Sequence, residues 1–157
     1  MSDFTVTPRA KLTPEQNKQL DTVLAEAAKD PDLQGEKPTA SSVIVVDESV
    51  AGFYSPAKTS MKGLSYWRAG ALYLSKKYRG KGLMKEVLRA FFDKHRPGIT
   101  WIANDNHASI KTFTGIGFKE YSEREYGGMA GKWYTLSSSP GFQKGKWYQT
   151  LKPAANA

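Results

Sequence analysis

The segment Lys77-Tyr78-Arg79-Gly80-Lys81-Gly82-Leu83-Met84 decides how this 157-residue chain folds. It follows an apolar run at residues 68–75, which is typical of a buried strand. It precedes a run to His95 whose apolar residues recur every three or four positions, as they do on one face of a helix. Glycines let a ligand approach the backbone, and the first N–H groups of a helix attract anions. The segment therefore predicts a phosphate-binding turn between a strand and a helix.

This turn differs from two common phosphate-binding loops. It lacks the Gly-Lys-Ser/Thr ending of a P-loop and the three-glycine pattern of a dinucleotide-binding fingerprint. Taken alone, a basic Gly-x-Gly segment is equally compatible with a tight turn that carries solvated lysines. The rest of the chain has to decide between these interpretations.

Composition limits the class of protein. The length and a hydrophobic fraction of 39% are typical of one globular domain. Without cysteine the chain has no disulfide, no thiolate metal site and no cysteine nucleophile, and no metal site is expected. The first residues lack an apolar signal core and no apolar run has membrane-spanning length, so we expect a cytoplasmic protein without a membrane partner.

The net charge of +8 is unevenly distributed along the chain. Residues 49–85 contain eight Lys and Arg and no Asp or Glu, and residues 126–157 contain four Lys and no acid. A concentrated positive potential favours an anionic cofactor, a nucleic acid or an acidic protein face. The alternative interpretation is a surface that keeps the protein soluble.

The remaining sequence predicts an α/β fold with a mixed sheet. The other expected elements are a first strand or arm around Phe4 and Val6, a helix that starts at the capping Thr13 and fades by Lys29, strands at 42–47 and 50–55, a basic loop at 56–67, a strand at 99–103, a short helix to Ile116, and an antiparallel pair at 118–126 and 132–136.

A short sequence motif is repeated near the end of the given chain. Gly131-Lys132-Trp133-Tyr134-Thr135-Leu136 returns as Gly145-Lys146-Trp147-Tyr148-Gln149-Thr150-Leu151. Two copies do not make a solenoid. We interpret residues 139–157 as a C-terminal extension that supplies an extra edge strand or a binding flap.

Two segments together resemble a known family. Leu72-Tyr73-Leu74 followed by Arg79-Gly80-Lys81-Gly82 resembles the strand-loop-helix that binds acetyl-CoA in the GNAT superfamily of N-acyltransferases. Asn106 to Phe118, with Phe113 between them, looks like that family's second signature. The resemblance implies a single α/β domain at residues 1–138, with a GNAT-like, mostly antiparallel mixed sheet flanked by helices.

The resemblance also implies acetyl-CoA as the cofactor. The backbone N–H groups of the loop would bind the pyrophosphate, and the main chain of two β-strand residues would hold the pantetheine arm. Lys77 stands where the family usually has Gln or Arg and can steer a phosphate. The implied cofactor-binding residues are Leu72, Leu74, Lys77, Arg79, Gly80, Lys81, Gly82, Leu83, Met84, Asn106, Ser109 and Phe113.

The implied reaction is direct attack of a primary amine on the thioester in a ternary complex. It needs a base for the ammonium and an acid or dipole for the leaving thiolate. Phe113 stands where the family commonly has a tyrosine acid, and residues 68–75 contain no Glu. The candidate replacements are Tyr73, Asp105 and His107.

Three functions therefore compete. The first is an N-acetyltransferase acting on a small-molecule or macromolecular amine. The second is a nucleic-acid-modifying protein acting on a DNA or RNA base, since Mom-type DNA-modifying proteins share the GNAT fold and Lys58, Lys62 and Trp67 fit a phosphate-tracking surface. The third is a non-catalytic CoA-binding module. A homodimer is compatible with each of them.

Overall fold

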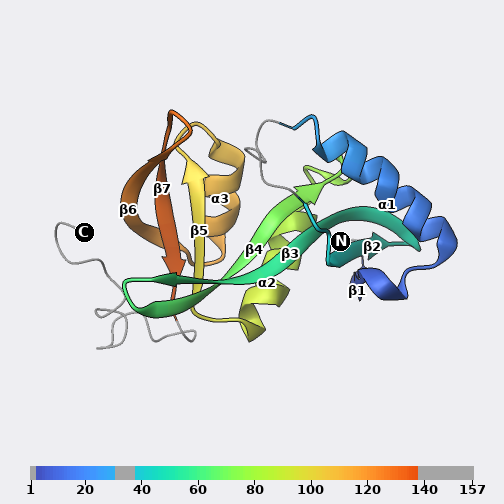
Figure 1. The fold of residues 1–157 in the computed structure, drawn as a ribbon, viewed down its shortest axis with the longest axis horizontal. Helices are drawn as coiled ribbons and strands as arrows, with labels where there is room; N and C mark the ends of the chain where they lie inside the picture. Colours follow the sequence, from blue (N-terminus) through green and yellow to red (C-terminus); the bar gives the residue numbers. More distant parts are fainter. Residues whose placement is uncertain (1–2, 31–37, 138–157) are drawn as a thin grey trace. The chain divides into compact units, whose positions relative to one another are not determined.

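The structure is a computed structural model that describes residues 3–30 and 38–137. Within these residues a seven-stranded sheet has the order β1-β2-β3-β4-β5-β7-β6 (Figure 1). Among the registers described, β4 pairs with β5 in parallel and the other pairs are antiparallel. The elements are β1 (Phe4–Pro8), α1 (Pro14–Ala27), β2 (Ser42–Val46), β3 (Ser49–Met61), β4 (Leu64–Leu74), α2 (Leu83–Lys94), β5 (Gly98–Ala103), α3 (His107–Gly115), β6 (Lys119–Tyr126) and β7 (Met129–Leu136), with short 3-10 helices at Arg9–Lys11 and Lys76–Tyr78. The predicted mixed, mostly antiparallel α/β fold is confirmed.

The chain divides into two compact units. Unit 1 comprises Met1–Ala57 and Ala69–Val87, and unit 2 comprises Lys58–Arg68 and Leu88–Ala157. The predicted phosphate-binding turn lies in unit 1, and the helix of the second signature lies in unit 2.

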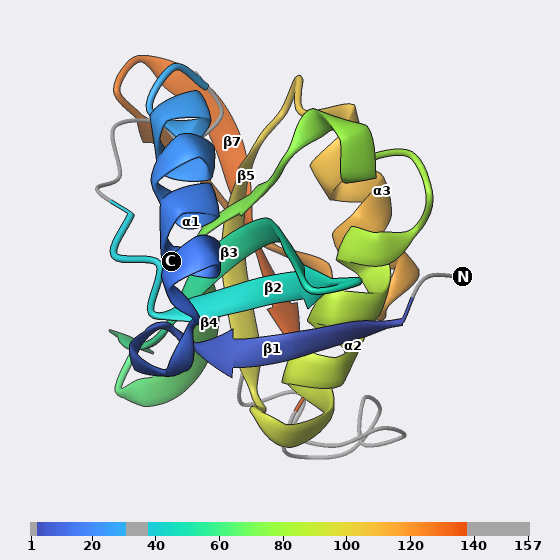
Figure 2. The same cartoon turned by 90° about the vertical axis from the view of Figure 1, so that its right-hand side faces the viewer.

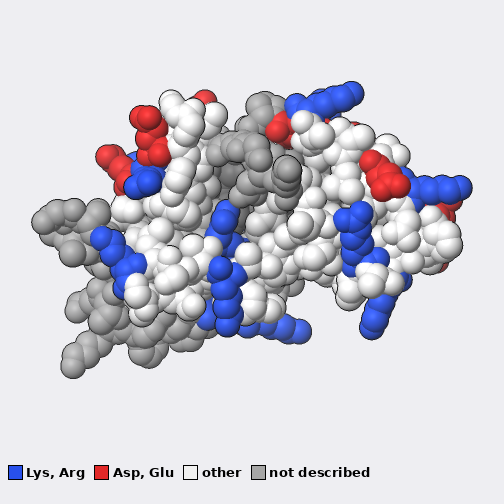
Figure 3. Space-filling view, viewed as in Figure 1, with Lys and Arg blue, Asp and Glu red and all other residues white. Residues whose placement is uncertain are grey.

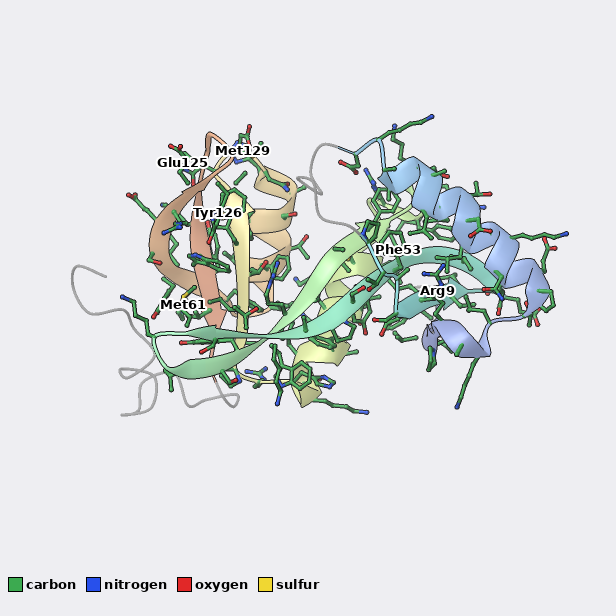
Figure 4. All side chains as sticks on the ribbon, in the orientation of Figure 1. Arg9, Phe53, Met61, Glu125, Tyr126 and Met129 are labelled. Carbon is green, nitrogen blue, oxygen red and sulfur yellow. The ribbon has the colours of Figure 1, made fainter. Side chains whose placement is uncertain are left out.

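Unit 1 is built around α1 and the strands beside it (Figure 2). The helix starts with the capping box that the sequence predicts: the Gln16 N–H donates to Thr13 Oγ1 at 3.1 Å, and the Thr13 N–H donates to Gln16 Oε1 at 3.0 Å. Leu20 is fully buried on the apolar face of α1. It shares a hydrophobic cluster with Phe53 of β3, labelled in Figure 4, and with Tyr73 of β4. The rings of Phe53 and Tyr73 stack with their centres 5.8 Å apart. Apolar burial against the strands therefore holds this helix in place.

The expectation of a basic loop at residues 56–67 is wrong. These residues form the distal part of a long hairpin in which β3 continues to Met61 and β4 starts at Leu64. Lys62 and Gly63 make the turn with φ angles of 54° and 80°, as a two-residue hairpin turn requires. Met61, Leu64 and the fully buried Tyr66 join one hydrophobic cluster, so packing and cross-strand pairing override the weak local preference for a strand.

β4 is not a regular strand. Ala71 has a φ of 48°, in the left-handed region that non-glycine residues rarely adopt. The residue is buried, with 8% of its surface exposed. The predicted buried strand is confirmed, and Ala71 adds a local irregularity that the sequence did not indicate.

Unit 2 combines β5, β6 and β7 with α3 and the end of α2. Trp101 of β5 lies opposite Trp133 of β7, and Gly98 pairs with Trp67 at the parallel end of β4. A side chain at residue 98 would lie 2.7 Å from the ring of Phe92, so glycine permits this close packing. The predicted closing pair and the short capped helix are confirmed.

Three expectations concern the C-terminal extension, the membrane and metal ions. The C-terminal extension and its echoed segment lie outside the described residues. In the described ranges no helix is both long and apolar enough to cross a membrane, and no group of three or more His, Cys, Asp or Glu there could hold a metal ion.

Candidate functional site

The turn before α2 has an open, glycine-lined backbone. Gly80 and Gly82 have φ angles of 78° and 80°, and a Cβ atom built on either would meet no atom within 4 Å. The Glu86 N–H donates to the Gly82 carbonyl at 3.1 Å, so Gly82 directly precedes α2 and its carbonyl accepts the first helical hydrogen bond. The N–H groups of the first helical turn, including those of Leu83 and Met84, have no partner within a helix of this kind. An anion in front of this turn would meet N–H donors and the positive end of the helix dipole.

The side chain of Arg79 holds this turn in unit 1. Its Nε donates to the Leu74 carbonyl at 2.6 Å, and its NH2 group lies 3.4 Å from Asp30 Oδ2. Its guanidinium also lies 5.1 Å from the centre of the Tyr73 ring. The sequence predicted a role only for the Arg79 main chain, whereas the structure uses the side chain to join the turn to β4 and to the segment after α1.

Glu26 of α1 is a site residue that the sequence did not indicate. Its Oε2 accepts a hydrogen bond from Ser75 Oγ at 3.1 Å and a longer one from the Tyr73 hydroxyl at 3.4 Å. Burial raises the pKa of the Tyr73 phenol. The positive charge of Arg79 lowers this pKa, and the negative charge of the Glu26 carboxylate raises it further. Tyr73 is therefore a protonated phenol at neutral pH, with its hydroxyl on the α1 side of β4.

A cavity of about 450 Å³ opens beside these residues in unit 1. One face of α1, the start of β3 and the 3-10 helix at Lys76–Tyr78 surround it. Lys77 is part of its wall, with Nζ 5.1 Å from the centre of the Tyr78 ring. The lining residues are Gln19, Thr22, Val23, Glu26, Ser49, Val50, Ser75, Lys76, Lys77 and Tyr78.

The main chain of β4 supplies the other part of the predicted site in unit 1. The one register pair described between β4 and β5 is Trp67 with Gly98 in unit 2, so within unit 1 the end of β4 has a described partner strand, β3, on one edge only. Leu72 follows the irregular Ala71 directly and is half-buried. The carbonyl of Leu74 already accepts the Arg79 hydrogen bond. An extended ligand that paired with this edge would therefore meet a strand whose geometry is set by Ala71 and Arg79.

The predicted residues of unit 2 gather at the start of α3. Asn106 Oδ1 accepts the Ser109 N–H at 3.2 Å, so Asn106 is the helix N-cap. Asp105 and His107 are exposed on either side of it. Phe113 is 7% exposed and packs edge-to-face against Phe118, with ring centres 5.1 Å apart. Their predicted roles toward the cofactor and the substrate stay predictions.

Among the predicted catalytic residues, Tyr73 belongs to unit 1, and Asp105 and His107 belong to unit 2. The structure brings Tyr73 together with Glu26 and Arg79, a cluster that no local sequence pattern predicts. The Glu26–Tyr73 hydrogen bond spans 47 positions of sequence, which is why only the packing of α1 on β4 reveals it.

The sequence also matches the model of a known protein family. The model of the acetyltransferase (GNAT) family matches residues 10–118, which is more than half of the chain. No curated protein matches the sequence significantly.

Solved structures share the fold at low sequence identity. A ribosomal-protein-S5-alanine acetyltransferase from Vibrio fischeri has a TM-score of 0.69 and 11% identity, over 94% of this chain and 96% of that one. A GNAT-family acetyltransferase from Streptococcus agalactiae has a TM-score of 0.68 and 12% identity, over 87% and 96%. A chain of the NatC complex, bound to Gag peptide and CoA, has a TM-score of 0.62 and 14% identity, over 86% and 98%. The family match and the shared fold together show that this chain belongs to the GNAT family of acetyltransferases.

Proposed function

We propose that this protein is an N-acetyltransferase that transfers the acetyl group of acetyl-CoA to a primary amine. The observation that carries the proposal is the glycine turn at Gly80 and Gly82, which presents open backbone at the start of α2 in a chain of this family. The structural relatives include a complex that contains CoA, which supports the choice of cofactor.

The residues of unit 1 fit acetyl-CoA. The thioester of the bound cofactor supplies an activated acyl group. The N–H groups of residues 79–84 bind its diphosphate, and Lys77 attracts the same charges. The edge of β4 aligns the pantetheine arm through the main chain of Leu72. The cofactor-binding roles of Asn106 and Ser109, which belong to unit 2, rest on the family resemblance alone.

Proton transfer is assigned to the three predicted residues. Tyr73 keeps its proton at neutral pH because burial raises its pKa, so it acts as a proton donor to the leaving thiolate and not as a base. His107 takes the proton of the attacking ammonium, and Asp105 is the alternative acceptor for that proton. Each single substitution His107→Ala and Tyr73→Phe should lower turnover by about 10²-fold without loss of CoA binding.

Gly82→Asp tests the proposal directly. The carboxylate adds bulk and negative charge where the diphosphate would bind, so calorimetry should detect no CoA binding. Gly63→Asp is the matched control, because Gly63 has the same φ of 80° and its Cβ would also meet nothing within 4 Å. The control should bind CoA normally. Equal CoA affinity in the two variants would overturn the assignment of the turn.

Turnover separates a transferase from a binding module. Release of free CoA from acetyl-CoA is measured with pools of small amines, peptides and DNA. Release stimulated by one pool supports the transferase and identifies its acceptor class. Tight CoA binding with no stimulated release would instead favour the non-catalytic module.

A nucleic-acid acceptor is the second candidate, and the β3–β4 hairpin favours it. In unit 2, Lys58 Nζ lies 4.9 Å from the centre of the half-buried Trp67 ring, on a hairpin segment that contains no Asp or Glu. On the face drawn in Figure 3, acidic side chains gather near the β6–β7 end and along α1. A cation beside an aromatic ring is the combination that single-stranded nucleic acids use for backbone and base contacts.

Salt dependence tests this second candidate. DNA affinity should fall steeply with salt, and Lys58→Gln with Lys62→Gln should weaken binding and reduce the slope of log K against log salt by about 1 to 2. Lys18→Gln on α1 is the control for a change of surface charge. A salt-insensitive interaction, or equal losses in the control, would remove nucleic acid from the candidates.

A further inference from the structure

The cavity of unit 1 is lined by groups of both charge signs around a volume suited to a small molecule. Its volume of about 450 Å³ lies within the range of ligand pockets. Gln19, Thr22, Val23 and Glu26 recur at the three- and four-residue spacing of one helix face, so α1 forms one continuous wall. Residues 75–78 form another wall, and Ser49 and Val50 of β3 complete the lining.

The acidic group of this cavity is Glu26. Both of its hydrogen bonds, from Tyr73 and Ser75, end on Oε2. Among the described residues no hydrogen bond ends on Oε1, which leaves one carboxylate oxygen as an acceptor for a ligand. The two bonds also restrict the side chain, so the carboxylate is already oriented before a ligand binds.

Cationic and apolar groups complete the lining. Lys76 and Lys77 place ammonium groups on the wall of residues 75–78, and Lys77 lies over the Tyr78 ring. Val23 and Val50 are each 5% exposed and form an apolar floor. Gln19 Oε1 accepts the Val50 N–H at 2.9 Å, which fixes the amide and leaves its NH2 group as a donor.

We propose that this cavity binds a free α-amino acid with an aliphatic side chain. Its ammonium pairs with Glu26, its carboxylate pairs with Lys76 and Lys77, and its side chain covers Val23 and Val50. A simple anion would also face the Glu26 carboxylate, and a diamine would face two lysines, so a zwitterion satisfies the lining best. The proposal concerns binding alone and does not depend on acetyl transfer.

The test uses three probes that differ in one charge. Calorimetry without acetyl-CoA measures the full-length protein with L-leucine, N-acetyl-L-leucine and L-leucinamide. Leucine should bind saturably, and each derivative should bind about ten-fold more weakly or worse, because one charge-assisted hydrogen bond is lost. Absence of saturable leucine binding would overturn the proposal.

Matched variants assign each charge to its partner. Glu26→Gln keeps an oxygen acceptor for Tyr73 and Ser75 but should remove the preference for leucine over N-acetyl-L-leucine. The double variant Lys76→Gln with Lys77→Gln should remove the preference for leucine over L-leucinamide. Asp21→Asn removes one negative charge, as Glu26→Gln does, and Lys18→Gln removes one of the two positive charges that the lysine pair loses. Both residues lie on α1 outside the cavity lining, and both substitutions should leave the two preferences unchanged. Unchanged selectivity in Glu26→Gln would contradict the assignment, and circular dichroism verifies the fold of each variant.

Discussion

Arg79 shows how a single side chain can hold a ligand-binding turn. Its guanidinium joins the Leu74 carbonyl to Asp30, two groups that a lysine ammonium cannot reach with the same planar geometry. The ion pair with Asp30 is partly exposed, with 42% of the arginine side chain accessible, so its effect on stability is small. The main consequence of the contact is the shape of the turn.

Arg79→Lys should therefore weaken CoA binding by about ten-fold while the free energy of unfolding changes by less than about 1 kcal/mol. Calorimetry with CoA and urea denaturation measure the two quantities. Arg124→Lys on β6 is the control, since that arginine belongs to unit 2 and should leave CoA affinity unchanged. Wild-type CoA affinity in Arg79→Lys would mean that the turn keeps its shape without this contact.

The buried side chain of Tyr66 gives a second prediction about a single residue. Its side chain is fully buried, and no described residue makes a well-formed hydrogen bond with its hydroxyl, although the Tyr121 hydroxyl lies near enough to raise its pKa. Since an unsatisfied buried hydroxyl destabilises the fold, Tyr66→Phe should raise the free energy of unfolding by about 1 kcal/mol. Urea denaturation measures the change.

Tyr126→Phe is the comparison for Tyr66→Phe. Tyr126 is 40% exposed near the end of the β6–β7 hairpin, and its hydroxyl can contact water (Figure 4). Its loss should change stability by only a few tenths of a kcal/mol, the scale expected of surface substitutions. A loss of stability in Tyr66→Phe would show that the buried hydroxyl has a partner after all.

At the scale of elements, β3 and β4 approach each other too closely for a side chain at residue 52. A methyl group on Gly52 would overlap the carbonyl oxygen of Tyr73 and lie 3.0 Å from the Leu74 Cα. Both neighbouring atoms belong to the backbone of β4, so the strand itself would have to move. This strand also carries the predicted pantetheine edge, so the spacing of the hairpin affects the site.

Gly52→Ala should lower the free energy of unfolding by about 1–3 kcal/mol and weaken CoA binding, because overpacking displaces β4. Gly70→Ala gives a graded comparison, since its methyl group would meet only the Ser55 carbonyl at 3.0 Å. The loss there should be smaller. Equal losses in the two variants would show that the contact with β4 does not control stability.

At the scale of the whole molecule, five buried or partly buried tyrosines share one pH dependence. Burial is the first cause that raises the pKa in each of them. In the unfolded chain a tyrosine ionises near pH 10, whereas the folded protein keeps these protons to higher pH. The affected residues are Tyr54, Tyr66, Tyr73, Tyr121 and Tyr134.

The sign of the effect follows from this difference. Below pH 10 both states hold the protons and the stability is complete. As pH rises above 10 the unfolded state releases protons first, so the free energy of unfolding should fall progressively. Urea denaturation between pH 8 and 11, with tyrosinate absorbance in parallel, measures the fall. Tyr66→Phe should make the slope shallower, and an unchanged stability up to pH 11 would contradict the explanation.

Local signals in the sequence predicted much of the fold and part of the site. Thr13 and Gln16 predicted the start of α1, and Asn106 predicted the start of α3, because capping involves residues only three positions apart. The strand, the glycine turn and the helix at residues 68–95 were also predictable, since hydrophobic periodicity and glycine act over a few residues. These local patterns carried the family resemblance as well.

The tertiary structure alone decided the features that join distant segments. The Glu26–Ser75 and Arg79–Asp30 contacts each span 49 positions, and no periodicity or motif relates such pairs. The extension of β3 and β4 through residues 56–67 depended on cross-strand pairing, and the left-handed Ala71 depended on its surroundings in β4. The sequence by itself therefore determined where the helices, most of the strands and the glycine turn lie. The packing of α1 against β4 decided which side chains surround that turn, because long-range contacts form only when separate elements bury their apolar faces together.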